Sequence, residues 1–326
     1  MSSPSPASRI QGCLVGTAVA ESAVLAGLSA EGAGNEGTLR PLGAAGQLTL
    51  FTADALLEAI EWANSGVHAD EAACVWLASL RWVSAQGVPI SPTAPVGQPR
   101  WLDTQDGVLV PVASAPAWTS SLTGGEMGSP SRPVGLEFDD AGAAAHAAPF
   151  GLVPHITAAA VAKMSVDGAS LTHGAAVAVQ AAAAVACVVH FLTLGADLRT
   201  AAESARAQIG SFRSPEAGIS EALEPVPEPE ADFSGDRRGA GRTLAGAVSA
   251  VLAAESAAEA GDAPQAAFVG GVQLAAAHGP DAAAIAGALL GTRWGREAVP
   301  SRWVSATAGM KAAAGLAARL AEAAGA

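Results

Sequence analysis

The sequence predicts an all-α protein that folds as a single compact helical domain. Half of its 326 residues are hydrophobic and only 14% are charged, so the chain can bury a sizeable core. Alanine runs such as 181–184 and 282–284 favour helix, because alanine loses no side-chain entropy there. Apolar residues also recur at helical spacing along most of the chain.

The individual elements follow from this spacing and from the breakers between them. Residues 1–8 are rich in Ser and Pro and lack the features of a signal peptide, so we expect a disordered tail before a helical domain over 9–326. Helices are expected at 9–28, 48–64, 69–85, 141–150, 156–166, 173–194, 197–209, 243–260, 264–278, 282–291 and 306–324.

Two regions interrupt the helical pattern. An irregular insert at about 87–133 is rich in Pro, Ser, Thr and Gly, and a connection this long is typically functional or disordered. Trp101 and Trp118 lie in it and could act as a lid or contact a partner. An acidic, proline-rich linker at about 211–242 includes the alternating Glu/Pro run 224–230 and is expected to be extended and solvated.

Composition argues against several classes of partner. A net charge of −13 argues against nucleic-acid binding, which needs clustered Lys and Arg. Residues 175–194 are apolar enough to raise the question of a membrane span, but they contain Gln180 and His190, and we expect a buried core helix and no membrane contact. Three cysteines without a C-x-x-C pair predict reduced thiols and a cytoplasmic protein.

The block 278–303 carries the clearest resemblance to a known family. Its ending, with Gly295, Val299-Pro300 and Trp303, resembles the Gly-x-x-x-Ile-Pro-x-x-Trp that closes the sequences of the ADP-ribosylglycohydrolases, which are helical hydrolases with a dinuclear magnesium site. The family's block opens with Gly-Gly-Asp-Thr-Asp-Thr. Aligned without gaps, the two aspartates and two threonines become His278, Pro280, Gly279 and Asp281.

Four further segments resemble the family in the same order, at 9–22, 46–52, 141–151 and 171–174. In the first, Glu21 replaces the aspartate of a Gly-Asp pair. In the second, Thr49 and Thr52 match the family's Thr-Asp-Asp-Thr, but Leu50 and Phe51 replace both aspartates.

The other two segments concern the ligand and the start of a helix. The third resembles a loop that faces ADP-ribose in the family; Gly142 is kept, while His146 replaces an arginine and Ala141 an asparagine. In the fourth, a Thr-His pair matches, and we expect Thr172 to cap the long helix that follows.

The resemblance implies the fold but not the family's chemistry. Magnesium requires oxygen ligands, and none of the four aspartates of the two Asp-rich motifs is present at its position, so we expect no metal site and no cofactor. Asp54 lies two residues further along the helix and should point away from the lost ligands. The predicted cleft comprises Glu21, Thr49, Leu50, Phe51, Thr52, Gly142, His146, His278 and Asp281.

Three functions remain open at this stage. The first is a catalytically degenerate member that binds ADP-ribose, another nucleotide-like ligand or a protein partner through the former cleft, with a regulatory role. The second is an ADP-ribosyl hydrolase that works without magnesium, with Glu21 and His146 as candidate catalytic residues. The third is a helical scaffold that assembles with other proteins.

Overall fold

Helices account for nearly all regular structure in the computed structural model, which describes residues 3–27, 39–153, 155–224 and 239–326. Over these residues there are fourteen α-helices and three short 3₁₀ helices. The described residues form no β-strand, only two isolated bridges, Arg40–Thr307 and Ser129–Arg132. The all-α prediction is therefore confirmed.

The first seven α-helices are α1 (Pro6–Leu25), α2 (Ala44–Asn64), α3 (Glu71–Ala85), α4 (Pro116–Ser121), α5 (Gly142–Ala145), α6 (Ala158–Ala169) and α7 (Ala176–Thr193). The other seven are α8 (Leu198–Gly210), α9 (Ala217–Ala222), α10 (Gly239–Glu259), α11 (Pro264–Ala276), α12 (Pro280–Trp294), α13 (Ser301–Ser305) and α14 (Met310–Ala323). The 3₁₀ helices are η1 (Trp101–Thr104), η2 (Ala148–Leu152) and η3 (Arg296–Ala298).

The first helix begins earlier than the sequence pattern predicted. Ser5 is its N-cap, and the Ser5 hydroxyl accepts a hydrogen bond from the backbone N–H of Ser8 at 3.1 Å. Pro6 occupies the first turn, where its missing N–H costs nothing. The expectation of a disordered tail over 1–8 was therefore wrong for residues 6–8, because an N-cap serine followed by proline is itself a helix start.

The expected irregular insert at 87–133 is more ordered than predicted. It contains η1 and α4, and among the apolar side chains that it buries in the core are Leu102, Val108, Trp118 and Leu122. The expected linker at 211–242 includes α9 and the start of α10. Residues 225–230 of its acidic proline run lie outside the described residues.

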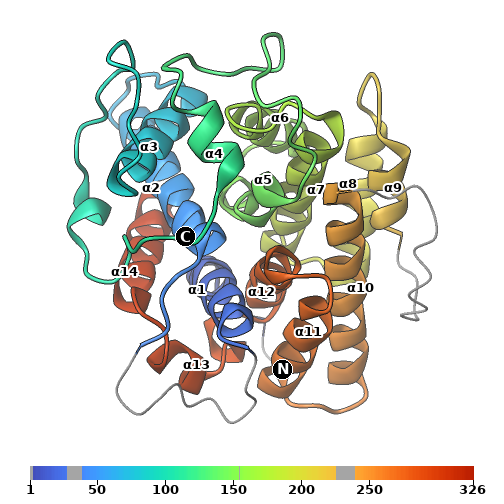
Figure 1. Cartoon of the computed structure of the whole chain (residues 1–326). Coiled ribbons are helices and arrows are strands. Elements are labelled where there is room, and N and C mark those ends of the chain that lie inside the picture. The colour runs from blue at the N-terminus through green and yellow to red at the C-terminus, as the bar shows by residue number, and fades with distance from the viewer. Residues whose placement is uncertain (1–2, 28–38, 154, 225–238) are drawn as a thin grey trace.

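The centre of the molecule is the contact between α1 and α12, which lie side by side with α2, α3 and α14 on one flank and α7, α8 and α10 on the other (Figure 1). Glycines make this contact close: a Cβ on Gly12 would lie 2.1 Å from the carbonyl oxygen of Gly291, and one on Gly16 would lie 2.3 Å from that of Gly287. Only hydrogen at these positions lets the two backbones meet.

The apolar helix α7 packs inside this assembly. It is long and apolar enough to cross a membrane, with a mean hydropathy of 2.0, but 72% of it is buried within the protein. This packing is that of a core helix.

Candidate functional site

The fold brings most of the predicted cleft residues together from four separate segments. Glu21 near the end of α1 reaches the start of α2, and Thr52 of α2 contacts His146, which follows α5. Asp281, in the first turn of α12, is close enough to influence the charge of Glu21. These contacts connect Glu21 with α2 and with Asp281, and Thr52 with His146.

Glu21 serves as a cap for α2. Its two carboxylate oxygens accept hydrogen bonds from the backbone N–H groups of Ala45 (2.9 Å) and Gly46 (2.7 Å), which are among the orphan donors at a helix N-terminus. The side chain is buried, and this burial raises its pKa to about 7. Both oxygens are thus already engaged by the protein itself.

The floor of the predicted cleft is apolar. Leu50 and Phe51 are 0% and 1% exposed, and the guanidinium of Arg81 lies over the Phe51 ring at 5.4 Å from its centroid. Neither side chain offers an oxygen to a metal. Thr49 is also fully buried, and its hydroxyl has no hydrogen-bonding partner among the described residues.

The side chains of the predicted cleft do not fit the two magnesium ions of the family. Hard cations need several oxygens in near-octahedral geometry, whereas here two positions are hydrocarbon and the carboxylate of Glu21 is used as a helix cap. Within the described residues, no three His, Cys, Asp or Glu side chains gather closely enough to hold a metal ion.

His146 is held neutral in the interior. Its Nδ1 is 3.1 Å from the hydroxyl of Thr52, and its Nε2 has no partner among the described residues. Burial, together with the smaller effect of the nearby His173, lowers its pKa to about 3. An imidazole in this environment is uncharged at neutral pH, so it lacks the second ring proton that an imidazolium gives up as a general acid.

Trp118 of α4 packs against these histidines. Its ring centroid is 5.6 Å from that of His146 and 5.2 Å from that of His173. A Cβ on Gly142 would lie 2.4 Å from the edge of the same indole. Trp118 is 6% exposed, so it fills space beside the expected ligand loop.

A hydrogen-bonded chain missed by the sequence reasoning lies beside Trp118. The Thr172 hydroxyl bonds Nδ1 of His173 (2.8 Å), and His173 Nε2 bonds the carboxylate of Asp140 (3.2 Å). This hydrogen bond is the main cause of a lowered pKa at Asp140. The sequence contains one signal for this group: Asp140 directly precedes the segment 141–151, which resembles the family's ligand-facing loop.

The predicted capping role of Thr172 was wrong. Helix α7 begins at Ala176 and its N-cap is Ala175, which supplies no side-chain hydrogen bond. The backbone N–H of Gly174 instead bonds the carbonyl of Gly135, just after the insert. Residues 172–175 thus lie outside the helix, and the Thr172 hydroxyl bonds His173.

The remaining candidates form the partly exposed rim. Gly279, with φ +100°, makes the turn from α11 into α12 and separates His278 from Asp281. The ring of His278 lies against Gly246, where a Cβ would be 2.3 Å from it. Burial raises the pKa of Asp281, and the negative charge of the nearby Asp140 adds to this effect. Asp140 and Asp281 thus place two carboxylates at this rim.

Comparisons with known proteins agree with this architecture. A sequence model of the ADP-ribosylglycohydrolase family matches residues 2–326. The chain belongs to this family. A solved structure described as an "ADP-ribosylglycohydrolase-related protein complex" has a TM-score of 0.63 and 19% identity, over 98% of this chain and 99% of that one, which shows a shared fold. A comparison with curated proteins gives no match.

Asp54 does not replace the aspartates of the ADP-ribosylglycohydrolase motif. Its carboxylate pairs with Arg81 (2.7 Å) and with Arg100 (3.0 Å) and is buried. Arg81 also bonds Asp103, and Arg100 bonds Glu61 at 3.1 Å. This ion network ties the insert to α2 and α3.

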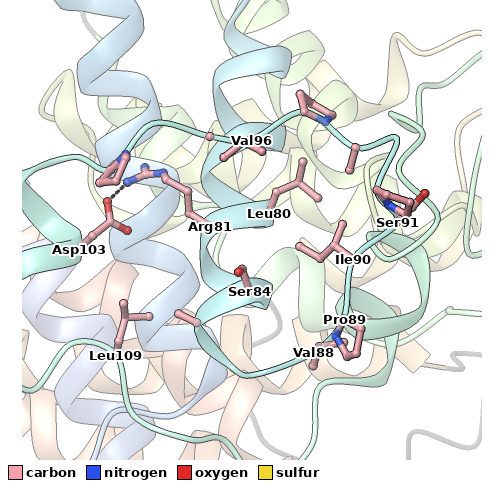
Figure 2. A pocket seen from close by; sticks show the side chains of 16 residues that line it. Leu80, Arg81, Ser84, Val88, Pro89, Ile90, Ser91, Val96, Asp103 and Leu109 are labelled. Carbon is pink, nitrogen blue, oxygen red and sulfur yellow. Dashed lines mark hydrogen bonds and ion pairs between the residues drawn. The ribbon is translucent and has the colours of Figure 1, made fainter.

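Between the insert and α3 lies a cavity of about 600 Å³ (Figure 2). Leu80, Arg81 and Ser84 of α3 face it, opposite Ile90 and Val96 of the insert. It contains none of the predicted cleft residues, so the insert adds a separate hollow on the outer side of α3.

Proposed function

We propose that this chain is a catalytically degenerate ADP-ribosylglycohydrolase-fold protein that binds a protein segment at the rim of the former cleft. The observation that carries the proposal is the buried hydrocarbon floor: Leu50 and Phe51 are sealed in the core at the positions where the family holds metal. Without the metal, nothing in this floor activates water or balances a phosphate.

Charge favours a protein segment over ADP-ribose as the occupant. The rim presents Asp140 and Asp281, and a diphosphate would meet these carboxylates with no metal between them. Like charges in a partly buried site repel strongly. Trp118 also fills space beside Gly142, on the loop that would face the nucleotide.

A metal-free hydrolase is the weaker alternative. Glu21 accepts two backbone hydrogen bonds, and His146 is buried with a pKa of about 3. A general acid or base works best with a pKa near the operating pH and with access to substrate. His146 meets neither condition, because its pKa is far below neutral pH and its side chain is buried.

A scaffold role differs from the proposal only in where the partner docks. The solved relative is described as a protein complex, which agrees with an assembly role for this chain. A cytoplasmic location belongs to the same proposal and is supported by three free, buried cysteines.

The catalytic half of the proposal is tested with purified protein. We expect no release of ADP-ribose from ADP-ribosyl-arginine with either Mg²⁺ or EDTA, and no change in melting temperature with millimolar ADP-ribose, because a ligand stabilises only what it binds. Hydrolysis that survives EDTA and is lost in His146→Ala would overturn it and support the alternative.

The binding half is tested by affinity purification from native cells. We expect a stoichiometric protein partner that is lost when Asp140 and Asp281 are both replaced by Lys. The matched control is Glu259→Lys, an exposed acid on α10. Capture that resists the rim variant but needs another face of the protein would instead support the scaffold role.

A further inference from the structure

We propose that a groove between α2, α3 and α6 binds a basic segment of another protein that carries one large apolar side chain next to Lys or Arg. The groove consists of an apolar pit and an adjoining acidic shelf. It goes beyond the proposed function, since Ile60 in the pit is roughly 16 Å along α2 from Thr49 of the former cleft.

The pit is an open cavity of about 320 Å³. Its walls are mainly hydrocarbon and come from α2, the segment before α6, α6 itself and the end of α14. The principal side chains are Leu56, Ile60, Val153, Ile156 and Met164. This volume is at the small end for ligand sites and suits one apolar side chain, the kind of anchor that dominates many protein interfaces.

The shelf is a cavity of about 550 Å³ that shares Glu71, Ile156 and Met164 with the pit, so the two are continuous. Asp70, Glu71 and Asp167 line it together with Lys163 and His68. The Lys163 ammonium lies 2.5 Å from Asp167.

Three carboxylates thus surround one ammonium on the shelf. Asp167 raises the pKa of Lys163, and the charges of Glu71 and Asp70 add to the effect. The excess negative charge lies directly beside the apolar pit, so charge complementarity selects a cationic residue adjacent to the apolar anchor.

The same charges decide between possible occupants. A second copy of this chain brings a net charge of −13 to an acidic groove, and a nucleic acid brings phosphates; both are repelled. A basic segment of a different protein combines the two features that the groove offers.

The test uses a fluorescein-labelled peptide, Gly-Lys-Lys-Leu-Lys-Lys-Gly, and measures polarisation at low salt with the full chain. A second probe replaces Leu by Ser at the same charge. We expect roughly tenfold weaker binding for the Ser probe, which corresponds to burial of one leucine side chain. Raising the salt should weaken both probes.

Two variants locate the site. Ala63→Phe fills the mouth of the pit from an exposed helix position, and Glu71→Gln neutralises the shelf. We expect Ala63→Phe to remove the preference for the Leu probe and Glu71→Gln to weaken binding several-fold. The matched controls are Ala207→Phe, exposed on α8, and Glu259→Gln; both should bind like the unmodified chain, as should the rim variant Asp140→Asn.

Equal binding of the Leu and Ser probes would overturn the proposal, because it would show only general attraction to an acidic protein. Unchanged Leu-probe binding in Ala63→Phe would overturn it as well. Self-association that Ala63→Phe abolishes, seen by sedimentation, would assign the groove to a second copy instead.

Discussion

At Glu21, burial and two backbone partners set the role of a single carboxylate. The side chain still points toward the start of α2, but both oxygens accept backbone N–H groups there. Gly43 and Gly46 make room for it: a Cβ on Gly43 would lie 2.3 Å from one carboxylate oxygen. The residue therefore caps the helix that carries Leu50 and Phe51.

This environment makes stability depend on pH. The pKa of Glu21 is about 7 in the folded state against an ordinary 4.5, so the folded state keeps a proton that the unfolded state releases between these values. Stability should fall as pH rises from about 4.5 to 7, by roughly 3 kcal/mol from this group. Urea unfolding of Glu21→Gln across this range should lack that share of the decline.

Glu259→Gln is the control for this experiment, because Glu259 is exposed. It should leave the pH dependence unchanged. If Glu21→Gln and the unmodified chain lost stability in parallel from pH 4.5 to 7, the assignment to Glu21 would be wrong.

At the scale of elements, the pairing of α1 with α12 depends on bare backbone. Gly12 and Gly16 lie in the segment 9–22 that resembles the family, and each faces a carbonyl of α12 at a distance that no Cβ tolerates. The element that carries the first cleft residue is therefore fixed in place by its own glycines.

Gly12→Ala should destabilise the protein by about 1–3 kcal/mol or more, because the new methyl overlaps the Gly291 carbonyl and the two helices must separate. Gly270→Ala on α11 is the control: nothing lies within 4 Å of its Cβ position, and a helical Gly→Ala change should stabilise by about 0.5–1 kcal/mol. Chemical denaturation measures both. Equal effects would refute the close-contact account.

At the scale of the whole molecule, the ion network around Asp54 joins the insert to the helical body. Asp54 and Arg81 belong to α2 and α3, whereas Arg100 and Asp103 belong to the insert. Because Asp54 is buried between two guanidiniums, the pairs are shielded from water and should act together.

Arg100→Ala should cost about 1–3 kcal/mol of stability, since hydrogen bonds to charged groups are lost in a partly buried place. It should also speed thermolysin cleavage within 88–109. Arg206→Ala, which removes an ion pair whose partners are about half exposed, should change stability by less than about 1 kcal/mol. Cleavage of Arg100→Ala at the unmodified rate would show that other contacts hold the insert.

The sequence alone determined the helical class, the family and the absence of oxygen donors at positions 50 and 51, because these follow from composition, local periodicity and residue identity. It did not reveal the order within the insert or the ion pairs of Asp54, which depend on contacts between distant segments. The start of α1 has a local signal, Ser5 followed by Pro6, which the sequence prediction missed.

Only the tertiary structure decided what each cleft residue does. Glu21 became a helix cap because the start of α2 lies beside it, and His146 became a neutral core residue because Trp118 and α2 enclose it. The pit and its acidic shelf were equally invisible in the sequence, since their walls come from segments up to about 270 residues apart. Residue identity limits the chemistry that a position can perform, but burial and partners, which only the packed chain supplies, set its actual role.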